Sequence, residues 1–159
     1  MRMNIAHAWD HYDVVRSLTL ATLQATKEEQ ADIVPEGFSN NIRWNIGHVL
    51  FTQDALLYGG KAPHLPESYA ALFGPGTKPA DWQGELPTLE TLNQQLAEQT
   101  ERIKKEFADR FEEKLPSPFN LRGKAEIDTF GGMFLFSLYH EGMHASTVTL
   151  LRKALQNQA

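Results

Sequence analysis

Cysteine is absent from this sequence of 159 residues, and its absence removes several kinds of chemistry. Without a thiol the chain has no disulfide bond, no thiolate zinc site and no cysteine nucleophile. Any metal ion must therefore be bound by histidine, aspartate, glutamate or backbone oxygen atoms. A chain without disulfides is also compatible with the cytoplasm, which is the location we expect.

Long apolar runs and an excess of positive charge are missing as well. No segment approaches the roughly 20 apolar residues that a membrane-spanning helix needs. The formal net charge is -5, whereas proteins that bind nucleic acid normally present a basic surface. We therefore expect neither a membrane nor a nucleic acid as a partner, and a small molecule as the substrate.

The composition indicates one ordinary globular domain. Hydrophobic residues make up 42% of the chain and charged residues 22%, values that are common in soluble proteins. A chain of this length can bury a sizeable core, and we find no internal repeat or low-complexity stretch. We therefore expect residues 1–159 to form a single domain.

Apolar residues recur at spacings of three and four in four segments, which predicts four helices. The expected helices cover residues 4–26, 39–58, 88–115 and 128–156. Residue types that favour helix N-caps stand at 39–41 and at Thr88, where the second and third helices begin. Residues 59–87 are rich in proline and glycine and form a long loop between these helices. The predicted fold is all-α, a four-helix bundle with a long loop between helices 2 and 3.

The motif H-E-x-x-H lies in the last expected helix, from His140 through Glu141 to His144. Side chains four residues apart share one face of a helix, about 5–6 Å apart at Cβ, so both imidazoles can bind one metal ion. Neutral imidazole suits zinc, nickel, copper and iron. The alternative is a pair of core or surface histidines that other residues satisfy.

A catalytic metal ion normally has a third protein ligand. In zincin peptidases that ligand follows the motif, but no histidine, aspartate or glutamate follows His144 here. A peptidase is therefore disfavoured, and the third ligand must precede the motif. His48 is the best candidate, because it lies in the middle of an apolar helical segment beside Gly47, which leaves space for a ligand.

Three other histidines precede the motif. His7 and His11 are four residues apart on the first expected helix, and we expect them at the surface or the rim of the site. His64 lies in the long loop, where we expect it to be solvated.

The segment N-I-x-W-x-I-G-H-V-L around His48, followed much later by Y-H-E-x-x-H-A, resembles the DinB/YfiT-like metalloenzyme superfamily. The resemblance extends along most of the chain. It implies a four-helix bundle that is commonly dimeric and that binds a metal ion, nickel or zinc, through three histidines. In this sequence the corresponding ligands are His48, His140 and His144. Characterised members of that superfamily include thiol-dependent S-transferases and isomerases.

A divalent ion on three neutral imidazoles keeps an open position, where it can activate water or bind a thiolate. We therefore expect a metal-dependent enzyme that acts on a small molecule, S-transferase-like with a low-molecular-weight thiol or hydrolase-like. The alternative is a non-catalytic, metal-binding homodimer. A metallopeptidase is the third possibility.

Four further residues are candidates for roles around the metal. Glu141 lies about 100° round the helix from His140 and is a candidate general base, with a helix-surface carboxylate as the alternative. Asn45 precedes His48 by three residues, so both can lie on one helix face and Asn45 can touch the site. Trp44 and Tyr139 are candidates to line a pocket beside the metal, although aromatic residues in a bundle more often belong to the core.

Overall fold

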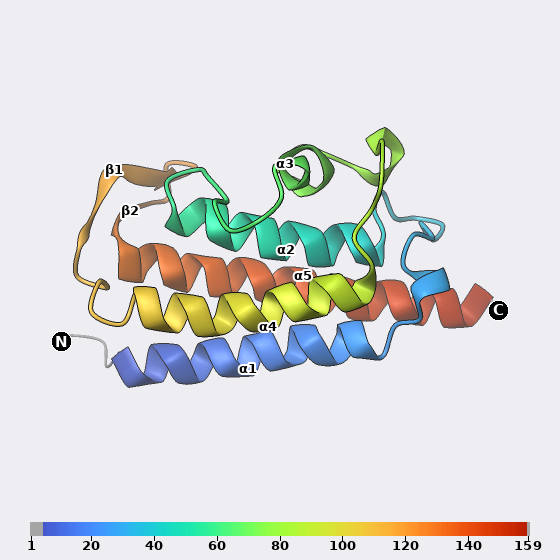
Figure 1. The fold of residues 1–159 in the computed structure, drawn as a ribbon, viewed down its shortest axis with the longest axis horizontal. Coiled ribbons are helices and arrows are strands. Elements are labelled where there is room, and N and C mark those ends of the chain that lie inside the picture. The colour runs from blue at the N-terminus through green and yellow to red at the C-terminus, as the bar shows by residue number, and fades with distance from the viewer. Residues whose placement is uncertain (1–4, 159) are drawn as a thin grey trace.

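The computed structural model describes residues 5–158, and most of them are helical (Figure 1). The four long helices are α1 (Ile5–Gln24), α2 (Ile42–Leu57), α4 (Leu89–Glu106) and α5 (Phe130–Gln158). They lie side by side along the longest axis of the molecule. Helix α5 packs against α1 and α2, and α4 packs against the same two helices, so each long helix has two long neighbours. Within the described residues, no helix is both long enough and apolar enough to span a membrane.

The long connection between α2 and α4 contains more regular structure than the sequence predicted. It includes α3 (Ser68–Phe73) and the short 3-10 helix η2 (Pro79–Asp81), while a second short 3-10 helix, η1 (Glu28–Gln30), follows α1. Helix α3 packs on α2 (Figure 1). The predicted loop is thus an ordered cover over one side of α2.

The prediction of an all-α fold was wrong between α4 and α5, where the chain forms a β-hairpin. Strand β1 (Lys114–Leu121) pairs with the antiparallel strand β2 (Ala125–Thr129). Helix α4 therefore ends at Glu106 and not at residue 115, and α5 begins at Phe130 and not at residue 128. Most hairpin residues are exposed or only half-buried, so no alternation of apolar and polar residues marked the strands in the sequence.

Two of the predicted helix starts have a visible physical cause. The side chain of Asn41 accepts a hydrogen bond of 2.8 Å from the backbone N–H of Trp44, which caps α2. Thr88 caps α4 in the same way, through the N–H of Thr91. Asp128, the predicted cap of α5, lies in β2 and pairs with Lys114. The hydroxyl of Thr129 instead accepts a hydrogen bond from the N–H of Gly132.

The core consists of two apolar clusters. The first surrounds the N-terminal part of α2 and the C-terminal part of α5, and it includes Ile42, Ile46, Leu50, Leu151 and Leu155. The second surrounds the C-terminal part of α4 and the N-terminal part of α5, and it includes Ile103, Phe107, Phe130, Phe134 and Leu138. A layer of buried polar residues separates the two clusters on every long helix.

Arg16 of α1 lies at the centre of this polar layer and is 2% exposed. Its guanidinium donates hydrogen bonds to Gln53 of α2, to Leu96, Gln99 and Thr100 of α4, and to Glu141 of α5. Burial lowers the pKa of Arg16, but its interactions with Glu141, Tyr12 and Asp54 together outweigh this effect, and the net pKa is raised. A permanently charged group therefore connects all four long helices.

Candidate metal centre

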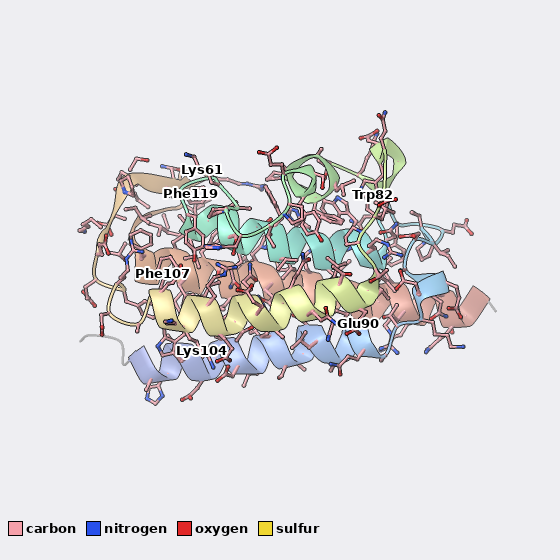
Figure 2. The ribbon with its side chains drawn as sticks, viewed as in Figure 1. Lys61, Trp82, Glu90, Lys104, Phe107 and Phe119 are labelled. Atoms are coloured by element: carbon pink, nitrogen blue, oxygen red, sulfur yellow. The ribbon has the colours of Figure 1, made fainter. Side chains whose placement is uncertain are left out.

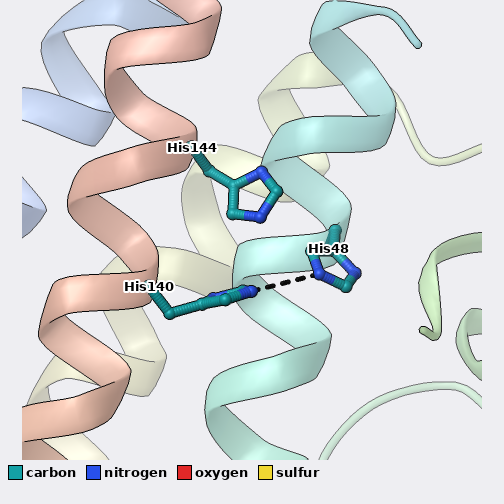
Figure 3. A group of neighbouring side chains, drawn as sticks. All are labelled: His48, His140 and His144. Carbon is teal, nitrogen blue, oxygen red and sulfur yellow. Dashed lines mark hydrogen bonds between the residues drawn. The ribbon is translucent and has the colours of Figure 1, made fainter. Parts of the chain in front are cut away.

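Three histidines from two helices meet where α2 packs against α5 (Figure 3). His48 comes from α2, and His140 and His144 come from α5. One ring nitrogen of each lies within 4.8 Å of the other two. The Nε2 atoms of His48 and His140 are 3.2 Å apart. Two imidazoles that each bind one ion at about 2.0–2.1 Å have nitrogen atoms roughly 3–3.4 Å apart, so this spacing fits a shared divalent cation.

The ring of His48 is fixed by the segment that covers α2. Its Nδ1 lies 2.6 Å from the backbone carbonyl oxygen of Phe73, the last residue of α3. A carbonyl oxygen only accepts hydrogen bonds, so Nδ1 carries the proton and Nε2 keeps its lone pair toward His140. Such a partner for the second ring nitrogen is typical of metal-binding histidines.

Gly47 makes the contact between the imidazole of His48 and the carbonyl oxygen of Phe73 possible. A Cβ atom at Gly47 would lie only 2.4–2.5 Å from ring carbons of Phe73, so no larger residue fits beneath that ring. The sequence predicted that Gly47 leaves space beside His48. The structure shows that this space is taken by Phe73, whose backbone then reaches the imidazole.

The ring of His144 is fixed in a similar way by Asn45. Its Nδ1 lies 2.7 Å from Oδ1 of Asn45. The amide nitrogen of Asn45 donates to Oδ1 of Asn40 and to the backbone oxygen of Asn41, both at 2.8 Å, which leaves Oδ1 as the acceptor for His144. His144 therefore also carries its proton on Nδ1 and has its Nε2 lone pair available.

Trp44 forms one wall of the centre. Its indole stacks on the imidazole of His48 with 4.5 Å between the ring centroids and an angle of 11° between the planes. Its Nε1 donates a hydrogen bond of 3.0 Å to the hydroxyl of Thr77, so the indole is itself fixed. The structure brings both Asn45 and Trp44 to the histidines.

Comparison with known families agrees with this geometry. The sequence model of the DinB superfamily matches residues 11–148, which include the three histidines. The chain belongs to the DinB superfamily. Its structure is similar to the crystal structure of a conserved protein from Enterococcus faecalis, with a TM-score of 0.67 at 15% sequence identity over 99% of each chain. At that identity the likeness concerns the fold alone. No curated protein matches this DinB-superfamily chain.

The three imidazoles of this DinB-superfamily protein are electrically neutral near pH 7. Burial lowers the pKa of His48. Burial, reinforced by the neighbouring histidines, lowers the pKa of His140 to about 4 and that of His144 to about 3. Because only the neutral ring can donate a lone pair to a metal ion, the site keeps its ligands in the binding form well below neutral pH.

The carboxylate of Glu141 is held by residues of α1 and not at the metal centre. It is 1% exposed, which excludes the helix-surface alternative. Its carboxylate accepts hydrogen bonds of 2.8 and 3.0 Å from Arg16 and one of 2.7 Å from the hydroxyl of Thr19. The structure therefore directs the carboxylate toward α1, and its placement gives no support to a general base at the metal.

The remaining candidates lie apart from the centre. The side chain of Tyr139 is 64% exposed, and its ring contacts that of Phe136 and is not brought to the imidazoles. His7 and His11 are exposed on α1, and the exposed His64 contacts the ring of Tyr58. The expectation that these three histidines lie at the surface is confirmed.

Two important contributors were missed in the sequence. The backbone carbonyl of Phe73 leaves no signal in a sequence, because any residue type supplies the same group. Arg16 did leave a signal, since its spacing of four from Tyr12 and seven from Leu23 places it on the buried face of α1. A charged residue on that face indicates a buried partner.

Proposed function

We propose that this chain is a divalent-metal-dependent enzyme that acts on a small molecule through His48, His140 and His144. The observation that carries the proposal is the arrangement of ring nitrogens. His48 and His144 each donate a proton from Nδ1 to a fixed acceptor, and their Nε2 atoms are left to bind a cation together with His140.

Nickel or zinc is the metal that we propose, because three neutral imidazoles suit both ions. When bound, such an ion supplies an open position at which a thiol or a water molecule is held as its anion. The residues of the chain supply the remaining requirements. Phe73 and Asn45 fix two of the rings, and Trp44 shields one face of His48 from water.

A transfer reaction that consumes a low-molecular-weight thiol is the activity that we favour, with hydrolysis as the second. In the transfer, the sulfur anion forms a bond to an electrophilic carbon while the leaving group departs with the electron pair, and the thiol proton goes to solvent. The half-buried positions of His140 and His144 favour such a reaction. A purely structural metal ion would be enclosed by protein ligands on all sides.

Two alternatives are less well supported. A non-catalytic, metal-binding dimer would need no access to the ion, whereas both histidines of α5 keep part of their surface exposed. A metallopeptidase of the H-E-x-x-H type needs the glutamate at the metal, and Glu141 is committed to Arg16 and Thr19.

The test uses the protein loaded with cobalt(II), whose absorption spectrum reports on its ligands. We expect 2-mercaptoethanol to add a sulfur-to-cobalt charge-transfer band, and the loaded protein to catalyse displacement of chloride from 1-chloro-2,4-dinitrobenzene by the thiol. Hydrolysis of 4-nitrophenyl acetate without thiol would favour the second activity. An unchanged cobalt spectrum together with no activity in either assay would contradict an enzyme.

We also propose that the four long helices form a four-helix bundle of the DinB/YfiT type and that the protein is cytoplasmic. We further propose that two copies of the chain associate as a dimer. An exposed apolar stripe on α5 supports the dimer. It consists of Leu135, Tyr139, Met143 and Leu150, which are 38%, 64%, 45% and 53% exposed. Light scattering should give twice the mass of one chain, and Met143→Glu should reduce it toward one chain. A single-chain mass for the unaltered protein would contradict the dimer.

A further inference from the structure

We infer that the cavity beneath the β-hairpin binds the apolar part of a small molecule whose polar head is bound at the three histidines. This inference rests on the proposed function and specifies the class of molecule involved. The cavity has a volume of about 470 Å³, which lies within the range of small-molecule sites.

The walls of this cavity are almost entirely apolar. They come from the end of α2 and the turn after it, between Thr52 and Gly60, from Pro75, from residues 115–119 of β1, and from Phe130 and Met133 in the first turns of α5. The polar side chains among them are the hydroxyls of Thr52 and Ser117. Among residues 5–158, no charged side chain lines the cavity, so an aliphatic or aromatic group is the occupant that fits it.

The β-hairpin is shaped to form one of these walls. Lys114 pairs with Thr129 and Phe119 pairs with Ile127, so four residues of β1 lie opposite a single residue of β2. Two of the four are Pro116 and Pro118, which have no backbone N–H to donate to a strand partner. This stretch of β1 is therefore released from regular pairing, and all four of its residues line the cavity.

One contact connects the cavity to the histidines, and a second reaches a residue one helical turn before His140. Thr52 lines the cavity, and its hydroxyl lies 3.4 Å from both ring nitrogens of His48, one helical turn away. On the opposite side, the ring of Phe119 contacts that of Phe136, which precedes His140 by one turn of α5. Phe119 marks the hairpin end of the molecule in Figure 2. A molecule bound by its head at the histidines can thus extend along α2 into the cavity.

The occupant that we propose is a metal-binding head group joined to a short aliphatic or aromatic tail. The scarcity of polar side chains in the walls disfavours a highly polar tail, such as a sugar or a phosphate ester, because its polar groups would lose their hydrogen bonds to water. A tail of several carbon atoms gains affinity from each apolar group that it buries.

A series of hydroxamates tests this inference, because the head group stays constant while the tail grows. We expect the zinc-loaded protein to bind hexanohydroxamate on the order of a hundredfold more tightly than acetohydroxamate, about three- to fourfold for each added methylene. Isothermal titration calorimetry measures both affinities. In the metal-free protein, 1-hexanol should still shift the NMR methyl signals of Met133 and Thr52.

Substitutions test whether the cavity is responsible. Ala55 lines it from α2, and Ala55→Phe should remove most of the tail dependence while leaving acetohydroxamate binding unchanged. Ser117→Trp should fill the cavity from the exposed strand β1 and likewise remove most of the tail dependence. It replaces Ala55→Phe in the test if that variant fails to fold. Ala21→Phe, an identical change on the exposed face of α1, is the matched control and should retain the full dependence.

The two proposals fail in different ways. Equal affinities for short and long hydroxamates, with zinc still bound, would overturn the cavity inference and leave the metal centre intact. Failure of the protein to retain zinc would overturn the proposed function and this inference with it. Retention of the tail dependence in both Ala55→Phe and Ser117→Trp would show that the tail binds elsewhere and would also overturn the inference.

Discussion

Asn45 and His144 face each other across the contact between α2 and α5, with 2.7 Å between Oδ1 of the amide and Nδ1 of the imidazole. The amide is held in turn by acceptors at the start of α2. One helix therefore orients a candidate ligand on the other. Partners of this kind raise metal affinity because they fix the tautomer and the direction of the ring.

Asn45→Ala removes this partner and should weaken zinc binding by about 10- to 100-fold, as measured by competition with a chelating dye. Asn45→Asp keeps an acceptor oxygen at the same position and should lose much less affinity. Asn93→Ala, a change of the same kind on α4, is the control for a general effect on the fold. Equal zinc affinities in the unaltered protein and Asn45→Ala would refute the role assigned to Asn45.

Gly47→Ala should disturb the imidazole of His48, the other ring that a fixed acceptor orients. The new Cβ would lie within 2.4–2.5 Å of the Phe73 ring, so α3 must shift and take the carbonyl partner of His48 with it. We expect a loss of about 1–3 kcal/mol in the free energy of unfolding, as for other overpacked sites, together with weaker zinc binding.

The control for this substitution is Gly142→Ala, also in a helix interior. Apart from its chain neighbours and the backbone of its own helix, a Cβ at Gly142 would meet no atom of the described residues within 4 Å. The variant should be as stable as the original or gain up to about 1 kcal/mol from the helical preference of alanine. Urea denaturation compares the two variants, and an equal effect of both substitutions would contradict the importance of the contact between Gly47 and Phe73.

Breaking the buried ion pair between Arg16 and Glu141 should be costly, since the remaining charge stays buried without its partner. Arg16→Met should reduce the free energy of unfolding by about 3–5 kcal/mol. The double variant Arg16→Met with Glu141→Gln should lose less than the sum of the two single changes. Glu113→Gln removes an exposed pair with Arg110, which water screens, and should change the free energy of unfolding far less than either change in the buried pair. If the losses of the two single variants simply add in the double variant, the result would argue against an energetic coupling between Arg16 and Glu141.

Acid should destabilise the metal-free protein through the histidine cluster. In the unfolded chain these histidines bind protons near pH 6.5, whereas in the folded chain the pKa of His140 is about 4 and that of His144 about 3. Between these limits the unfolded chain binds more protons, so the free energy of unfolding falls as the pH falls from 6.5 toward 4. Urea midpoints measured across this range should therefore decrease.

A double variant separates this effect from the titration of carboxylates. His140→Gln combined with His144→Gln removes the two most strongly shifted groups and should flatten the decrease between pH 6.5 and 4. Carboxylates that titrate in the same range are unaffected by these substitutions. An identical pH dependence in the variant and the original protein would contradict the assignment to the histidines.

Much of the candidate site could be predicted because its chemistry depends on a few side chains at helical spacing. His140 and His144 share a helix face, and His48 stands among the apolar residues Ile42, Ile46 and Val49 of its own helix. The caps Asn41 and Thr88 were visible for the same reason, since a local side chain determines each helix start. Local patterns of this kind persist whatever the tertiary structure.

The features that the sequence did not reveal depend on tertiary contacts. The β-hairpin buries little on either face, so it lacks a regular apolar period, and Pro116 and Pro118 argued against a strand. The direction of Glu141 was undetermined because its partner, Arg16, lies 125 residues away in the chain. Tyr139 was a candidate only through its position next to His140, and neighbouring residues on a helix point in different directions.

The metal content of three purified proteins tests the central claim most directly. Elemental analysis of the unaltered protein, His144→Ala and His7→Ala, each dialysed against buffer with trace zinc and nickel, measures bound metal per chain. We predict stoichiometric metal in the unaltered protein and in His7→Ala, whose exposed ring lies away from the cluster, and loss of stoichiometric binding in His144→Ala. Undiminished metal in His144→Ala would contradict the proposed metal centre.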